Sequence, residues 1–135
     1  MRILVIDGQG GQLGGQLIKT IRSHFSNCTI MAVGTNATAT SVMLKAGADQ
    51  VATGENPVLV FCRKADVIVG PIGIVIADAL YGEITPKMAV AVGQADATRI
   101  LIPINKCDHV VAGVSDLSVS ALLQDVIVQL EKLMK

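Results

Sequence analysis

Five glycines stand close together near the start of the chain, directly after the apolar run Arg2–Asp7. In "DGQGGQLGG", Gly8, Gly11 and Gly14 fit the spacing G-x-x-G-x-x-G, with Gly10 as an addition. Such glycines let the chain turn sharply out of a strand, let a pyrophosphate approach the backbone, and let a helix pack closely on a sheet. The first amides of that helix then face an anion, which the helix dipole also favours. The pattern predicts a site for a phosphate-bearing ligand, and a tight turn without a ligand is the structural alternative.

A second glycine-containing loop, "GPIG" at residues 70–73, follows another apolar run. In a doubly wound sheet, ligands bind at the carboxyl ends of the strands where the winding reverses. Both loops belong to this switch point. The residues predicted to contact the ligand are Gly8, Gln9, Gly10, Gly11, Gln12, Leu13, Gly14, Thr35, Asn36, Gly70, Pro71, Ile72 and Gly73. The expected ligand is a nucleotide or a dinucleotide such as NAD(P), and its identity stays open.

Two features depart from ordinary dinucleotide sites. Such sites place an acidic residue about twenty residues past the glycines to bind a ribose, whereas "VGTNATATS" is neutral here. Thr35 and Asn36 can hydrogen-bond a ribose or a phosphate, or they can cap the following helix. Asp7 would repel a phosphate, and the favoured role of its carboxylate is to bond the backbone of the glycine turn. A Mg²⁺ ligand and a base are the other roles open to Asp7.

Further polar residues stand after later strands without forming a recognisable catalytic set. Glu83 and Lys87 lie at the start of a predicted helix, near the expected crevice. Lys106, Asp108 and His109 follow the fifth predicted strand, and two possible ligands, an Asp and a His, do not make a metal site. A serine nucleophile would need a G-x-S-x-G turn, which the sequence lacks. We predict no metal, and whether the protein is an enzyme stays open.

The elements that position these residues follow from the alternation of strand-like and helix-like segments. The alternation predicts right-handed crossovers in one domain over residues 1–135, with a doubly wound, mostly parallel, six-stranded sheet of order 3-2-1-4-5-6. The last strand can pair antiparallel at the edge. Strands are predicted at residues 2–7, 28–33, 49–53, 65–70, 98–104 and 109–114. Helices are predicted at residues 12–25, 37–46, 56–64, 72–80, 86–95 and 118–135.

Composition supports a covered parallel sheet and excludes some partners. The chain is 51% apolar, with two Phe, one Tyr and no Trp, which suits strands buried on both faces. Eleven basic and eleven acidic residues cancel without a block of like charge, so neither a nucleic-acid face nor a polybasic membrane patch is expected. The surplus of apolar side chains predicts a homo-oligomer.

The expected compartment is the cytoplasm. The longest apolar stretch, residues 67–80, is too short to cross a bilayer. The first strand begins right after Met1, which leaves no room for a signal peptide. Cys28, Cys62 and Cys107 are odd in number and widely spaced, as expected of free thiols in a reducing compartment.

Two resemblances support the fold and leave the reaction open. "GQGGQLGGQLI" resembles the glycine turn of the atypical, extended branch of the short-chain dehydrogenase/reductase superfamily. That superfamily uses a Tyr with a Lys four residues later, whereas Tyr81 is followed at that offset by Thr85. Over its whole length the chain resembles a small bacterial family of unknown function, DUF3842, through "VIDGQGG", "GTNATATSVMLKAGAD", "ATGENPV", "ADVIVGPIGIVIADALYGEITPKMA" and "ILIPINKC". This resemblance implies a Rossmann-like fold and no particular activity.

Three functions are therefore open. The first is a module that binds a nucleotide on the first turn, and the absence of a catalytic set favours it over the second, an enzyme that uses this ligand. The third is a homo-oligomeric assembly protein whose glycine turns are structural, with residues 72–80 at a subunit interface. The first function depends on amides of the glycine turn facing an open crevice. If the protein's own groups fill that crevice, a scaffold remains.

Overall fold

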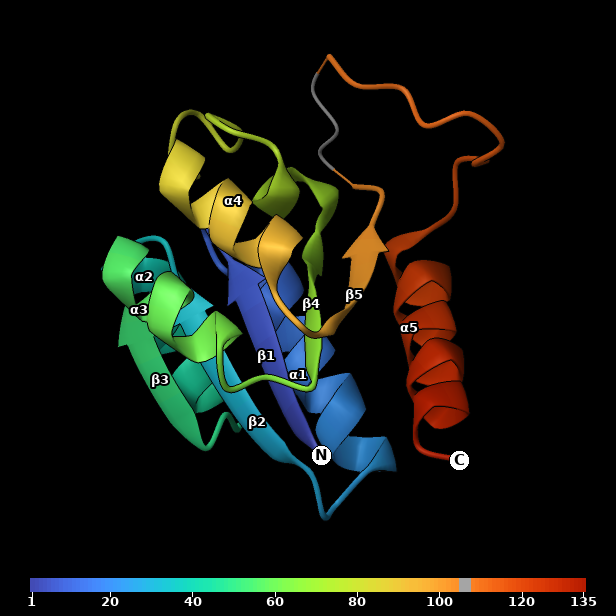
Figure 1. The fold of residues 1–135 in the computed structure, drawn as a ribbon. Coiled ribbons are helices and arrows are strands. Elements are labelled where there is room, and N and C mark those ends of the chain that lie inside the picture. The colour runs from blue at the N-terminus through green and yellow to red at the C-terminus, as the bar shows by residue number, and fades with distance from the viewer. Residues whose placement is uncertain (105–107) are drawn as a thin grey trace.

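The computed structural model describes residues 1–104 and 108–135 and shows a parallel sheet with helices on both faces (Figure 1). The strand order is β3-β2-β1-β4-β5, and all neighbours are parallel. The strands are β1 (Arg2–Asp7), β2 (Thr29–Gly34), β3 (Gln50–Thr53), β4 (Val67–Pro71) and β5 (Thr98–Ile102). The helices are α1 (Gln12–His24), α2 (Ala37–Lys45), α3 (Glu55–Cys62), the 3₁₀ helix η1 (Ile72–Val75), α4 (Pro86–Gln94) and α5 (Val119–Leu133).

The two faces of the sheet carry separate apolar cores. Ile3 and Val5 of β1 pack with α1, α2 and α5, whereas Leu4 and Ile6 pack with α3 and α4. Successive side chains of a strand point to opposite faces, so a strand that is apolar at every position must be covered on both sides. The predicted α/β fold with a parallel sheet is therefore confirmed.

The prediction of a sixth strand at residues 109–114 is wrong. These residues follow an irregular course, with Val110 93% exposed and Gly113 in the left-handed region at φ 81°. A left-handed residue breaks an extended run. The sheet consequently has five strands rather than six, and β5, which ends before Pro103, forms its edge.

The predicted helix at residues 72–80 is also wrong. After η1 the chain makes successive turns over residues 76–84. Leu80 and Ile84 are buried in the core on the α4 side of the sheet, and the Ile84 amide donates to the Ala79 carbonyl at 3.1 Å. Burial of these two side chains closes a compact loop in place of a helix. Each other predicted helix and strand is present, with small shifts at its ends.

The helix starts use different caps. Thr85 Oγ1 accepts from the Met88 amide at 3.1 Å and opens α4, as expected of a threonine before a proline at the first helical position. Helix α1 instead begins after the left-handed Gly11, with no side-chain cap at that residue. Across the described residues, no helix combines the length and apolar character needed to span a membrane. Cys28 and Cys62 are free, buried thiols, and Cys107 lies outside the described residues.

Candidate functional site

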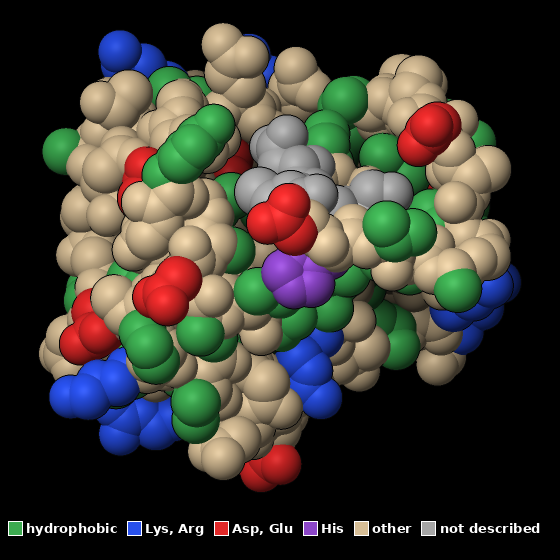
Figure 2. Space-filling view, turned by 90° about the horizontal axis from the view of Figure 1, so that it is seen from above, with side chains coloured by type: hydrophobic (Ala, Val, Ile, Leu, Met, Phe, Trp, Pro, Cys, Tyr) green, Lys and Arg blue, Asp and Glu red, His purple; other side chains and the backbone are tan. Residues whose placement is uncertain are grey.

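The candidate site lies where the winding of the sheet reverses. β1 pairs with β2 on one side and with β4 on the other, so the switch point lies between β1 and β4, as predicted. Three segments meet at the carboxyl ends of these strands, namely the glycine turn at residues 8–11, residues 35–36 after β2, and residues 76–85 after η1. Figure 2 looks onto this edge of the sheet.

Asp7 lies beneath the glycine turn and bonds its backbone. The carboxylate accepts from the Gly8 amide at Oδ1 (2.8 Å) and from the Gly14 amide at Oδ2 (2.7 Å). Burial raises the pKa of Asp7, and the nearby Glu83 charge also raises it. The hydrogen bonds from the Gly14 and Gly8 amides lower the pKa, but the net shift is upward. The preferred role of Asp7, tying down the turn, is confirmed. Both oxygens are bonded, and the described residues hold no cluster of three metal-ligating side chains.

Glu83, in the segment at residues 76–85, contacts the same glycine turn. Its Oε1 accepts from the Gln9 amide at 2.9 Å, from Asn36 Nδ2 at 3.0 Å and from the Thr35 hydroxyl. In the described chain, Oε2 has no hydrogen-bond partner. Partial burial acts to raise the pKa of Glu83, but the bonds from Thr35, Gln9 and Asn36 outweigh it and the pKa is lowered. Glu83 is therefore an ionised carboxylate held at the end of β2.

Of the two roles that the sequence left open for Asn36, the structure shows the helix cap. Its Oδ1 accepts from the Ala39 amide at 2.9 Å and caps α2. Its Nδ2 donates to the Gln9 carbonyl at 3.0 Å as well as to Glu83. The first turn of α2, the glycine turn and Glu83 are thus joined through one amide side chain.

The glycines of the turn have different surroundings. A Cβ on Gly8 would lie 2.5 Å from Thr35 Oγ1 and 2.8 Å from Glu83 Oε1, and a Cβ on Gly11 would lie 2.6 Å from Cα of Ala39 in α2. A Cβ on Gly14 would meet Met43 Sδ at 2.6 Å and Cβ of Asp7 at 2.9 Å. Helix packing, and not a ligand, fills the space beside Gly11. A Cβ on Gly10 would have nothing within 4 Å.

Three amides of the turn remain available. Gly10 and Gln12 are exposed and Leu13 is partly exposed. Their backbone N–H groups have no hydrogen-bond partner within the described chain, whereas Gly11 donates to the Gly8 carbonyl at 2.9 Å. The crevice predicted from the sequence is thus partly filled by Glu83, and the start of α1 stays open.

The second glycine loop is covered by the chain. Gly70, Pro71 and Gly73 are buried and Ile72 is partly buried. A Cβ on Gly70 would lie 2.5 Å from the Ile6 carbonyl oxygen, so this glycine allows close approach of two strands. Residues 70–73 of the predicted contact set therefore pack within the protein.

Comparison with known families gives one match that spans nearly the whole chain. Residues 2–135 match the model of a family described as a domain of unknown function, DUF3842. The chain belongs to this family. A search of the curated proteins finds no match to this DUF3842 chain.

The remaining candidate residues of this DUF3842 chain are exposed or lie outside the described residues. Lys87, Asp108 and His109 are exposed, and Lys106 lies outside the described residues. Figure 2 shows no gathering of described Lys and Arg side chains on this face. Any anion bound here would be held by backbone amides.

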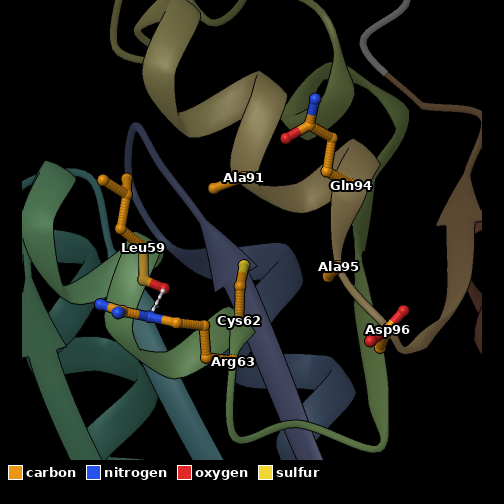
Figure 3. A pocket seen from close by; sticks show the side chains of 7 residues that line it. All are labelled: Leu59, Cys62, Arg63, Ala91, Gln94, Ala95 and Asp96. Carbon is orange, nitrogen blue, oxygen red and sulfur yellow. Dashed lines mark hydrogen bonds between the residues drawn. The ribbon is translucent and has the colours of Figure 1, made fainter.

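A cavity of about 490 Å³ lies elsewhere, between α3 and α4 (Figure 3). The Cys62 side chain points into it, and Arg63 Nε donates to the Leu59 carbonyl at 3.2 Å. Burial raises the pKa of the Cys62 thiol to about 11, so this thiol is protonated at neutral pH and is a poor nucleophile. The cavity lies at the C-terminal ends of α3 and α4, away from the glycine turn.

Glu83 is the residue of the candidate site that the predicted contact set omits. The sequence places Glu83 near the expected crevice but does not pair it with Gln9, Thr35 and Asn36. The lack of an acid after β2, together with a glutamate in the segment that follows the other switch-point strand, is the sequence signal that could have identified it.

Proposed function

We propose that this protein binds a nucleotide or dinucleotide with a free ribose 2′-hydroxyl. The phosphate would lie on the amides at the start of α1, and Glu83 Oε2 would accept from the ribose. The single observation that carries the proposal is the fixed, ionised Glu83 carboxylate at the end of β2.

The position of Glu83 supports recognition of a ribose. Dinucleotide domains use an acid after the second strand to bind the ribose hydroxyls. Here β2 ends at Gly34 without an acid, and Glu83 comes to the same place from the loop after η1. Three donors fix Oε1 and leave Oε2 for a ligand. Because a carboxylate repels a 2′-phosphate, we expect NAD and ATP to bind more tightly than NADP.

The open amides of Gly10, Gln12 and Leu13 support binding of a phosphate. They lie at the N-terminus of α1, where backbone N–H groups and the helix dipole favour an anion. Both carboxylate oxygens of Asp7 accept hydrogen bonds from backbone amides, and Lys87 is solvent-exposed. These observations favour binding over catalysis.

The test is a thermal-shift and calorimetric panel with NAD, ATP, NADP and inorganic pyrophosphate. A ligand at 100 times its dissociation constant stabilises a protein by about 2.7 kcal/mol. We expect this shift with NAD or ATP, and a weaker one with NADP. Failure of all four probes to shift the unfolding temperature would contradict the proposal.

Two variants locate the site. Gly10→Val projects into open space, so it should block the phosphate without disturbing the fold. Gly93→Val is its matched control, because a Cβ there also has nothing within 4 Å and Gly93 lies in α4. Glu83→Gln should weaken NAD binding while leaving pyrophosphate binding in place. Unchanged NAD binding by Gly10→Val would place the ligand elsewhere.

A scaffold without a ligand is the second candidate. Its support is that Gly8, Gly11 and Gly14 each have a close neighbour inside the protein that explains the missing side chain. The same panel separates the two functions, because a scaffold shows no shift with any nucleotide.

A further inference from the structure

The open edge of the sheet carries unpaired backbone groups. β5 pairs with β4 alone, in parallel register, and the Thr98 amide donates to the Asp66 carbonyl at 3.1 Å. Alternate residues of a strand face the same neighbour. The amides and carbonyls of Arg99 and Leu101 therefore face away from β4, and within the described residues their amides have no other partner.

A groove of about 530 Å³ runs along this edge between β5 and α5. From the helix, Asp125, Gln129 and Lys132 line it, and their spacing places them on one side of α5. Val128 lies on the same side and is 41% exposed. Neither Asp125 nor Lys132 has an ion-pair partner among the described residues.

If two copies of the chain are related by a two-fold axis at this groove, Asp125 of one copy lies opposite Lys132 of the other. β5 and α5 run in opposite directions (Figure 1), and residues 98–101 lie beside residues 125–133 across the groove. A two-fold axis at Ile100 would set Arg99 opposite Leu101 of a second copy, where each such pair exchanges two backbone hydrogen bonds. The same axis passes near Val128 and Gln129, midway between Asp125 and Lys132.

We propose that β5 and α5 bind a second copy of this chain, joining the two sheets edge to edge in antiparallel pairing. Asp125 of each copy then faces Lys132 of the other. The exposed Val128 side chains meet at the axis and lose contact with water. Pairing also removes the open edge, which in a monomer is a site for unintended strand addition. The interface is separate from the glycine turn, so it does not depend on the proposed ligand.

A charge exchange tests this arrangement. Sedimentation at micromolar concentration should give a mass of twice 14.1 kDa. Asp125→Lys or Lys132→Asp alone should weaken dimerisation about tenfold or more, because each places like charges together twice. The double variant D125K/K132D should restore the dimer. Lys19→Asp, an equal charge reversal on an exposed position of α1, should leave the dimer unchanged.

A backbone variant tests the strand pairing independently of charge. Leu101→Pro removes an amide that faces away from β4, which an edge strand tolerates, and it should give a folded monomer. Leu101→Ala keeps the amide while losing similar side-chain packing, and it should remain dimeric. Circular dichroism checks that each variant is folded. A wild-type monomer, or a double variant that stays monomeric while folded, would overturn the proposal.

Discussion

The carboxyl groups of Asp7 and Glu83 approach one glycine turn, yet their pKa values shift in opposite directions. Burial raises the pKa of Asp7 above its ordinary 3.8, so its contribution to stability is present below pH 3.8 and is lost as the pH rises through the folded-state pKa. For Glu83, burial acts to raise the pKa, but hydrogen bonds lower it below 4.5. Its contribution is present above pH 4.5 and is lost as the pH falls through the folded-state value.

Glu83→Gln is expected to destabilise the protein in a pH-dependent way. Glutamine keeps the shape but loses the charge that Gln9, Thr35 and Asn36 bond, at a cost of about 1 kcal/mol near neutral pH. The difference in unfolding free energy from the wild type should shrink as the pH falls below 4.5, because protonated Glu83 then resembles glutamine. Urea denaturation across this range measures it. Glu131→Gln, at an exposed position of α5, is the control, and a difference independent of pH would contradict the role of the charge.

Gly8→Ala and Gly10→Ala are expected to have unequal effects, although both lie in the same turn. A Cβ on Gly8 overlaps Thr35 Oγ1 and Glu83 Oε1, so the substitution should cost about 1–3 kcal/mol through overpacking. A Cβ on Gly10 meets nothing within 4 Å, and the change should stay within about 0.5 kcal/mol. Thermal or urea unfolding compares them. Equal losses would show that Glu83 does not occupy the turn in solution.

Sequence reasoning located the glycine turn and the role of Asp7 because both depend on neighbours along the chain. It could not pair Glu83 with Gln9, since 74 residues separate them. Only the packing of the 76–85 loop brings those two together. The same limit applied to Gly11, whose close neighbour Ala39 belongs to α2.

At the scale of elements, the loop at residues 76–85 that positions Glu83 has a strained backbone. Asp78, Leu80 and Tyr81 have φ values of 67°, 57° and 57°, a region that costs a non-glycine residue about 1–2 kcal/mol. Burial of Leu80 and Ile84 offsets this cost. Backbone strain of this kind gathers at functional sites, which agrees with the place of the loop beside the glycine turn.

Tyr81→Gly is expected to stabilise the protein. Tyr81 is 97% exposed, so the loss of its side chain removes little packing, and glycine relieves the left-handed backbone by about 0.5–1 kcal/mol. Ala77→Gly, at an exposed position of the same loop without a positive φ, should destabilise by a similar amount through backbone entropy. Thermal or urea unfolding curves measure whether each substitution raises or lowers the free energy of unfolding. A loss of stability with Tyr81→Gly would show that Tyr81 contacts something in solution.

The elements that the sequence predicted wrongly share one cause. Residues 72–80 are apolar enough for a buried helix, but Leu80 and Ile84 must both reach the core directly after η1. Residues 109–114 are apolar enough for a strand, yet a strand also requires an extended backbone, which the left-handed Gly113 interrupts. The local pattern of apolar residues shows which side chains tend to be buried. It does not show which of several possible contacts each side chain makes in the folded protein.

At the scale of the whole molecule, the proposed ligand site and the proposed interface with a second copy lie at different parts of the sheet. The proposed ligand site is at the carboxyl ends of β1 and β2, whereas the proposed interface with a second copy runs along β5 at the side of the sheet (Figure 1). The parallel α/β class was predictable because aliphatic runs of four to six residues alternate with amphipathic ones. The open β5 edge was not, since it depends on where residues 108–118 run after the last strand.

Limited proteolysis is expected to cut the chain first within residues 108–118, without releasing α5. This segment is irregular, with Val110 93% and Leu117 53% exposed, and exposed irregular backbone is cleaved most readily. Leu123, Val126, Ile127 and Leu130 are buried against α1 and the sheet, which stabilises α5 at its place by several kcal/mol in total, at about 1.5–3 kcal/mol per buried side chain. Elastase digestion should give two fragments on a denaturing gel that elute together from a size-exclusion column. Separate elution, or a first cut inside residues 76–85, would show that the 76–85 loop or the α5 packing is less stable than its contacts indicate.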